Sequence, residues 1–346
     1  MRNAQASGAS ANLDLLRSVA VLLVLLDHLT RHYHHDRFGD LGYFGVLLFF
    51  VHTSLVLMYS MQRSRLTGAA LVKDFYIRRL FRIYPLSILA VLAALALHLH
   101  ADGRGLAIGS WPGTSEVLSN LFLVQNLTYA KSIIGPLWSL PLEVQMYVLL
   151  PLLFLWRKRS VWLLLLLWLA SGLLGHFPET VPALGWFTLL LYIPNFLPGA
   201  MAFTLPRRQF VPSYCWPLFL VLLAAMFFAV PSRRMGASEC LLLGFAIPLF
   251  KEITFRPLTW LANQIATYSY GIYLGHSFFI WYALTRHHSW VLFCVMWMVI
   301  PAVLFHAIER PAIETGKRLA ERLARRRTPA REFEPQDLEV ASLPTL

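Results

Sequence analysis

A chain of 346 residues in which 57% are hydrophobic and 14% charged is too apolar to be a soluble domain around a single core. A formal net charge of +12 would indicate a nucleic-acid partner in a soluble chain, but membrane proteins concentrate lysine and arginine in cytoplasmic loops. The composition therefore predicts an all-α, polytopic transmembrane helical bundle, and we expect no nucleic-acid partner.

Hydropathy along the chain predicts about ten transmembrane helices. They cover residues 13–30, 42–61, 80–100, 136–156, 161–177, 183–204, 214–230, 238–254, 258–284 and 290–309. The apolar segment from Val117 to Thr128 is too short to cross a bilayer, so we expect it to be re-entrant or interfacial. We expect a cytoplasmic tail over residues 1–12, a transmembrane domain over 13–316, and a cytoplasmic tail over 317–346 that is first basic, then acidic and partly disordered.

Lysine and arginine are unevenly divided between the two sides of this arrangement. With a cytoplasmic N-terminus, thirteen fall in inner loops, eight in the C-terminal tail and seven in outer loops. This 21 to 7 bias predicts that both termini are cytoplasmic. Arg17 then lies near the cytoplasmic end of the first helix and His28 near its outer end.

The first predicted helix carries Asp14, Arg17, Asp27 and His28 within an apolar segment. Arg17 and His28 are eleven residues apart, which is close to three helical turns, so both leave the same face about 16 Å apart. An arginine facing lipid is costly, so this face is expected to point into the protein or a wet cavity. The alternative is that Arg17 snorkels to one membrane surface while His28 lies at the other.

Three arginines lie at the start of the third predicted span. Arg82 follows Arg79 by three residues and Arg78 by four, which places Arg82 on the same side of a helix as each of the others. Guanidinium groups in such a cluster can donate pairs of hydrogen bonds to phosphate oxygens. The alternative interpretation is anchoring of the helix by cytoplasmic charge and anionic membrane lipids.

The fourth predicted helix has one polar stripe. Ser139, Glu143 and Tyr147 follow one another at intervals of four residues, directly after Trp138. A carboxyl group within a membrane helix is a candidate functional group, and the predicted orientation places this helix start level with His28, its expected partner. The alternative is that Glu143 stabilises the start of its own helix.

The remaining histidines are less specific. His276 lies in the ninth predicted span, where a histidine more often packs between helices than reacts. Histidines in the outer loop from Arg31 to Asp36 have a spacing that a metal could use, but no helix or strand frames them, so we expect no metal.

These motifs, taken in order, resemble those of the integral-membrane acyltransferase family 3, bacterial polytopic enzymes that acylate extracytoplasmic saccharides and other acceptors. The resemblance covers about residues 12–318. It is carried by Arg17 and His28 with ten residues between them, the stretch from Gly45 to Val51, Arg79 and Arg82 before Ile-Tyr-Pro, and the motif of Trp138, Ser139, Glu143 and Tyr147. Many members have Phe-Phe-Val-x-Ser-Gly-Phe in the second helix, where this chain has His52-Thr53-Ser54-Leu55 after the valine.

The resemblance implies an O-acyltransferase in the inner membrane of a bacterium. It would use acyl-CoA, with acetyl-CoA expected, as a donor substrate rather than a bound cofactor. The donor phosphates would lie near Arg79 and Arg82, with Arg78 in the same cluster. His28 would act as general base on an acceptor hydroxyl, since a histidine is largely neutral at pH 7. Glu143 or Asp27 would hold the imidazole, and Arg17 would orient the donor or the fourth helix.

In that interpretation Ser139, Trp138, Tyr147 and His276 have supporting positions, and an acyl-histidine intermediate remains an open alternative. A different class of protein would use the same buried groups: a proton-coupled saccharide transporter or exporter, with His28 and Glu143 as a proton relay. Transporters of this kind often contain internal repeats, and the sequence shows no convincing repeat of its halves.

Overall fold

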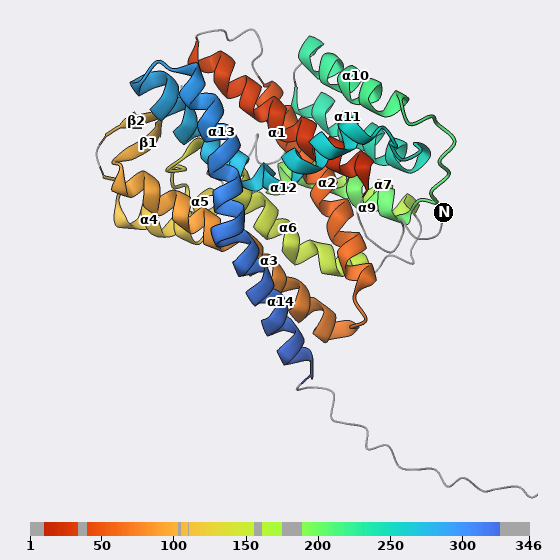
Figure 1. Ribbon diagram of the computed structural model, residues 1–346. Helices are drawn as coiled ribbons and strands as arrows, with labels where there is room; N and C mark the ends of the chain where they lie inside the picture. The colour runs from red at the N-terminus through yellow and green to blue at the C-terminus, as the bar shows by residue number, and fades with distance from the viewer. Residues whose placement is uncertain are drawn as a thin grey trace, which may run out of the picture.

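The computed structural model describes residues 10–33, 40–102, 105–109, 111–155, 161–174, 189–230 and 232–325. Helices dominate this part of the chain, which confirms the predicted all-α class (Figure 1). The long helices are α1 (Ala11–His32), α2 (Leu41–Arg63), α3 (Gly68–Ala96), α6 (Leu140–Leu155), α7 (Val161–Leu174), α9 (Leu189–Thr204), α10 (Cys215–Ala229), α11 (Arg233–Ala246), α12 (Arg256–Phe279), α13 (Trp290–Leu304) and α14 (Arg310–Arg325). Shorter elements are α4 (Thr114–Leu121), α5 (Gln125–Thr128) and the strands β1 (Leu99–Asp102) and β2 (Gly105–Ile108).

Four helical segments of the described chain are long and apolar enough to cross a membrane: Leu41–Arg63, Gly68–Ala96, Gly135–Leu155 and Trp290–Ala324. Four further apolar helices are shorter: Val161–Leu174, Leu189–Thr204, Cys215–Ala229 and Met235–Leu249. The helices α1 and α12 are in neither group, and both bury polar side chains. A polytopic helical membrane protein is therefore confirmed, while the number of ten spans stays a prediction.

The third predicted span, residues 80–100, begins inside a longer helix and overruns its end. The helix α3 begins at Gly68, before the predicted span, and ends at Ala96, four residues before the predicted end. Its early start packs against α14, and the longest apolar helix, Trp290–Ala324, is α13 continued into α14 through a π-helical turn at Phe305–Glu309. Gly316 of α14 faces Phe81 of α3, so the absence of a side chain lets the two helices approach closely.

A small unit of two strands and two short helices follows α3, and its strands were not expected. The strands β1 and β2 form an antiparallel hairpin in which Leu99 pairs with Ile108, and the amide of Ala101 donates to the carbonyl of Ile133 at 2.7 Å. The segment from Val117 to Thr128 forms the end of α4 and all of α5, which confirms that it is too short to cross a bilayer. In Figure 1 this unit lies on the opposite side of the bundle from α7, α9, α10 and α11.

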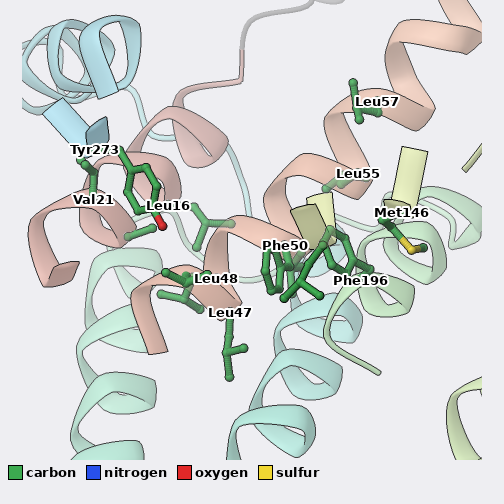
Figure 2. Close-up of a cluster of buried hydrophobic side chains, with 14 of the residues drawn as sticks. Leu16, Val21, Leu47, Leu48, Phe50, Leu55, Leu57, Met146, Phe196 and Tyr273 are labelled. Carbon is green, nitrogen blue, oxygen red and sulfur yellow. The ribbon is translucent and has the colours of Figure 1, made fainter. Parts of the chain in front are cut away.

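The centre of the bundle is formed by α1, α2 and α12. The helix α1 packs against both α2 and α12, and α2 packs in turn against α9. One continuous apolar core joins these helices, and Figure 2 shows part of it around α2. Because the polar side chains of α1 and α12 face inward with this core, their burial places ionisable groups inside the protein instead of toward lipid.

At Gly45 the helix α2 approaches the backbone of α1 closely. A β-carbon at this position would lie 2.5 Å from the carbonyl oxygen of Ala20, which is too close for any real contact. Gly172 of α7 is different, since no atom lies within 4 Å of the position that its β-carbon would take. The two glycines therefore separate the effect of helix packing from that of helix propensity.

We expect Gly45→Ala to lower the free energy of unfolding on the order of 1–3 kcal/mol, because the new methyl group must push α1 away from α2. Gly172→Ala should be neutral or stabilising, since alanine favours a helix over glycine by roughly 1 kcal/mol. Thermal unfolding of the purified variants in detergent measures both changes. Equal melting temperatures would contradict the close packing at Gly45.

Candidate functional site

A pocket of about 760 Å³ lies between α1, α2, α3, α6 and α12, and we call it the arginine pocket. Its polar lining combines residues from five separate parts of the chain: Arg17, His52, Thr53, Arg79, Arg82, Ser139, Glu143, Tyr147, Ser269, Tyr270 and Tyr273. The apolar lining is Val46, Phe49, Phe50, Val56, Leu57, Ile83 and Leu140. The structure thus brings six residues predicted from the first, third and fourth helices into one site: Arg17, Arg79, Arg82, Ser139, Glu143 and Tyr147.

Three guanidinium groups face this pocket and are held differently. The Nε of Arg17 donates to Ser269 Oγ. Arg82 forms an ion pair with Glu309, which belongs to the π-helical turn between α13 and α14. The side chain of Glu309 is 2% exposed. The Nε of Arg79 is buried and has no hydrogen-bond partner among the described residues. A buried donor without a partner is costly, which makes Arg79 a group that an anionic ligand can satisfy.

Glu143 lies in the arginine pocket, and the prediction that it partners His28 is wrong. Its carboxylate accepts a hydrogen bond of 2.6 Å from the hydroxyl of Tyr147, one turn further along α6. The chain enters α6 through a 3₁₀ turn at Gly135–Ser139, so Glu143 is already more than one turn beyond Trp138, which lines the cavity of His28. The stripe of Ser139, Glu143 and Tyr147 is confirmed, since all three line the same pocket.

Arg78 does not join the other two arginines of its cluster in the pocket. Its Nε donates to Asp74 at 2.9 Å. Arg78 lines a small depression near Ser60 and Ser64 but not the arginine pocket, whereas Arg79 lines both. The i,i+4 pair within α3 turns Arg78 away, because Asp74 lies on the preceding turn. The expectation that all three arginines act together is therefore corrected to two, Arg79 and Arg82.

His28 lines a second space, of about 840 Å³, which we call the histidine cavity. Its lining is Val24, Asp27, His28, Arg31, Gly42, Tyr43, Val46, Gly105, Gly135, Pro136, Trp138, Tyr273 and Ser277. Arg17 and His28 thus both face protein interior space, as their spacing predicts, but in different cavities. The alternative that Arg17 snorkels to a membrane surface does not fit this arrangement, because Arg17 lines an interior pocket.

The imidazole of His28 has a defined tautomer. Its Nδ1 lies 2.9 Å from the carbonyl oxygen of Val24, which can only accept, so the proton is on Nδ1 and Nε2 keeps a lone pair. Asp27 does not hold the ring, since its carboxylate is paired with Arg31 at 3.0 Å and lies 3.9 Å from His28 Nδ1. A histidine in this tautomer can accept a proton at Nε2.

His276 packs against His28, as expected of a helix-packing histidine, but its second nitrogen is unsatisfied. The two rings are 4.6 Å apart at an interplanar angle of 72°. Nδ1 of His276 donates to the Tyr273 carbonyl at 2.7 Å, while the buried Nε2 has no hydrogen-bond partner within the described segments. Two imidazoles of the same tautomer therefore lie in contact, and of the two only His28 lines the histidine cavity.

Several residues of the arginine pocket were missed by sequence reasoning. Ser269 and Tyr270 precede His276 on α12 and carry no motif of their own. Glu309 does not line the pocket but pairs with Arg82 beside it, and nothing in the sequence indicated that these two residues pair. His52, the departure from the usual second-helix motif, lines the pocket and is 4% exposed. Its position four residues after Leu48 on an inward face was the available signal.

No group of three or more His, Cys, Asp or Glu side chains that could hold a metal ion occurs within the described ranges. His34 and His35 of the outer-loop cluster lie outside those ranges. The expectation of a metal-free site therefore stays a prediction for that loop.

Comparison with known proteins assigns the chain to a family. A family model described as an acyltransferase domain matches residues 10–308, which include both cavities. The chain belongs to the integral-membrane acyltransferase family 3. No solved structure matches it.

Curated relatives of this family member carry names that state an acetyl transfer. Peptidoglycan O-acetyltransferase OatA of Listeria monocytogenes is 26% identical over 88% of this chain and 56% of its own length. YrhL of Bacillus subtilis, named provisionally as a peptidoglycan O-acetyltransferase, is 27% identical over 76% of this chain and 47% of its own length. The chain thus spans about half the length of the curated relatives it matches.

We expect Glu309→Gln to destabilise the protein strongly, because it leaves the Arg82 guanidinium beside a neutral group in the interior; loss of one partner of a buried pair costs roughly 3–5 kcal/mol. Glu314→Gln is the matched control, since Glu314 is exposed and pairs with Arg310 on the surface, where a pair is worth about 0–1 kcal/mol. Thermal unfolding compares the two. A smaller loss for Glu309→Gln than for Glu314→Gln would contradict the buried pair.

Proposed function

We propose that this membrane acyltransferase moves an acetyl group from cytoplasmic acetyl-CoA to a hydroxyl of an extracytoplasmic saccharide, with His28 as general base. The observation that carries the proposal is the pairing of two adjacent cavities: one presents arginines, and the other presents a histidine whose Nε2 can accept a proton. Family membership supports acyl transfer, and the relatives' names support acetyl as the group and peptidoglycan as the class of acceptor.

The arginine pocket suits the phosphates of the donor. Arg17, Arg79 and Arg82 supply three guanidinium groups against two carboxyl groups, Glu143 and Glu309. Planar guanidinium donors bind phosphate oxygens in pairs, and Arg79 has an unused buried donor to offer. Arg17, fixed by Ser269, lies on the same helix as His28 and is positioned to orient the pantetheine arm toward it.

The histidine cavity suits the acceptor. Tyr43 and Trp138 line it as stacked rings with centroids 6.1 Å apart. Such rings offer a large apolar surface with polar edges, which fits the apolar face and hydroxyl rim of a sugar ring. His28 lies in the same cavity, so a hydroxyl of a sugar held there is within the space that the base faces.

The reaction then needs one proton carrier. His28 Nε2 takes the proton of the acceptor hydroxyl as its oxygen attacks the thioester carbon, and the C–S bond breaks. The CoA thiolate leaves and takes the proton from the imidazolium, which restores the neutral histidine. The Val24 carbonyl keeps Nδ1–H in place through both steps, and it stabilises the imidazolium because it accepts a hydrogen bond from it.

We expect His28→Ala to reduce acetyl transfer on the order of 10²–10⁴-fold, the usual contribution of a general base. Purified protein in lipid nanodiscs is incubated with radiolabelled acetyl-CoA and peptidoglycan glycan strands or an envelope glycan extract, and label in the glycan is counted. His287→Ala is the control, because His287 is exposed and lines neither cavity. Normal transfer by His28→Ala would rule out the base assignment, and binding of saccharide without acyl transfer in wild type would favour a transporter.

We expect Arg79→Ala to raise the KM for acetyl-CoA about 10- to 100-fold, because hydrogen bonds between charged groups contribute roughly 1.5–3 kcal/mol. The KM for S-acetylpantetheine, which lacks the nucleotide phosphates, should change little. Arg78→Ala is the neighbouring control, since Arg78 is paired with Asp74 outside the pocket. Equal effects on both donors would show that Arg79 does not bind the phosphates.

A further inference from the structure

The arginine pocket and the histidine cavity share two lining residues in the described chain, Val46 of α2 and Tyr273 of α12. Both are buried, with 3% and 6% of their surface exposed. Trp138 lines the histidine cavity, and the next residue, Ser139, lines the arginine pocket, so the two spaces are also adjacent at this turn of the chain. Val46 and Tyr273 therefore lie on the boundary between the two spaces, and we call this boundary the neck.

The ring of Tyr273 is fixed at the neck by its surroundings. Its hydroxyl donates to the carbonyl of Pro136 at 3.0 Å, and Ser139 Oγ lies 2.7 Å from the same phenol oxygen. A carbonyl can only accept, so the phenol proton is used there and Ser139 donates to the phenol oxygen. Phe49 packs edge to face on the ring with centroids 6.0 Å apart. Figure 2 shows Tyr273 among the buried side chains of the core, so its two hydroxyl bonds are buried and set the direction of the ring.

The proposed reaction places the acyl group at this neck. The donor phosphates lie with Arg79 and Arg82, and the acceptor hydroxyl lies with His28, so the thioester carbon must meet the hydroxyl where the two cavities adjoin. The acyl chain beyond that carbon then occupies the space between a valine side chain and a fixed tyrosine ring. In an apolar pocket, one methylene more or less on the substrate changes the preference between two substrates by about 10- to 200-fold.

Resting on the proposed function, we propose that Val46 and Tyr273 set the length of the acyl group, and that the neck admits acetyl and rejects longer chains. Val46 restricts the neck by the volume of its two methyl groups. Tyr273 restricts it by the position of its ring, which the bonds to Pro136 and Ser139 maintain. Neither residue exchanges a proton or forms a bond in the reaction, so both are specificity-determining residues.

The test uses the full chain in nanodiscs with acetyl-, propionyl- and butyryl-CoA, and measures both acyl transfer to glycan strands and release of free CoA thiol. Val46→Ala should raise the ratio of kcat/KM for propionyl-CoA to that for acetyl-CoA on the order of 10-fold. Val56→Ala is the matched control: it removes the same atoms from the same helix, but Val56 lines the arginine pocket alone. The ratio for Val56→Ala should equal that of wild type.

A second variant tests the neck without changing the apolar volume. Tyr273→Phe keeps the ring but removes the hydroxyl that holds it, so the ring can swing aside and the use of butyryl-CoA should rise. Tyr270→Phe is its control, because the Tyr270 hydroxyl donates to the Ile83 carbonyl at 2.8 Å and Tyr270 lines the arginine pocket alone. This pair keeps the inference testable if Val46→Ala does not fold.

The outcomes separate the inference from the proposed function. Acetyl transfer by wild type, with unchanged donor ratios in both neck variants, would overturn the neck and leave the proposed function standing. Changed ratios in the neck variants and in their controls alike would also overturn it, because the selectivity would then belong to the whole pocket. A wild type that neither transfers an acyl group nor releases thiol from any of the three donors would overturn both.

Discussion

The ion pair between Arg82 and Glu309 connects an early and a late helix of the chain at the functional site. Arg82 belongs to α3 and Glu309 to the turn between α13 and α14, so the pair joins elements separated by more than two hundred residues. A helical bundle in a membrane gains little from apolar contact between its helices, because lipid is as apolar as they are. Polar contacts between helices, such as this pair and the bond from Arg17 to Ser269, therefore carry much of the specificity of the arrangement.

The same contacts determine which arginine is available to a ligand. Arg78 is paired with Asp74 and Arg82 with Glu309, while the Nε of Arg79 lacks a partner in the described segments. Three basic residues that are equivalent in the sequence thus have three different roles in the structure. Charge clusters in membrane proteins are interpreted correctly only when the acidic partner of each member is known.

The sequence predicts the general arrangement of the site because helical spacing is reliable over long apolar segments. Intervals of four residues correctly place Ser139, Glu143 and Tyr147 on one face. The separation of eleven residues between Arg17 and His28 correctly places both toward interior space. The depth of Glu143 could not be predicted, because it depends on a 3₁₀ turn that hydropathy does not detect. The β1–β2 hairpin was missed for a similar reason: four-residue strands carry too short a pattern to stand out beside a membrane helix.

The continuous helix from Trp290 to Ala324 determines where the membrane surface must cross the protein. Its 35 residues span about 52 Å, whereas the hydrocarbon layer is about 30 Å thick. The charged α14 half must therefore stand in water, together with the beginning of α3 that packs along it. In the proposed function, the charged nucleotide of the donor would meet Arg79 and Arg82 on the α3 side of this boundary, so that only the slender pantetheine arm would have to enter the interior.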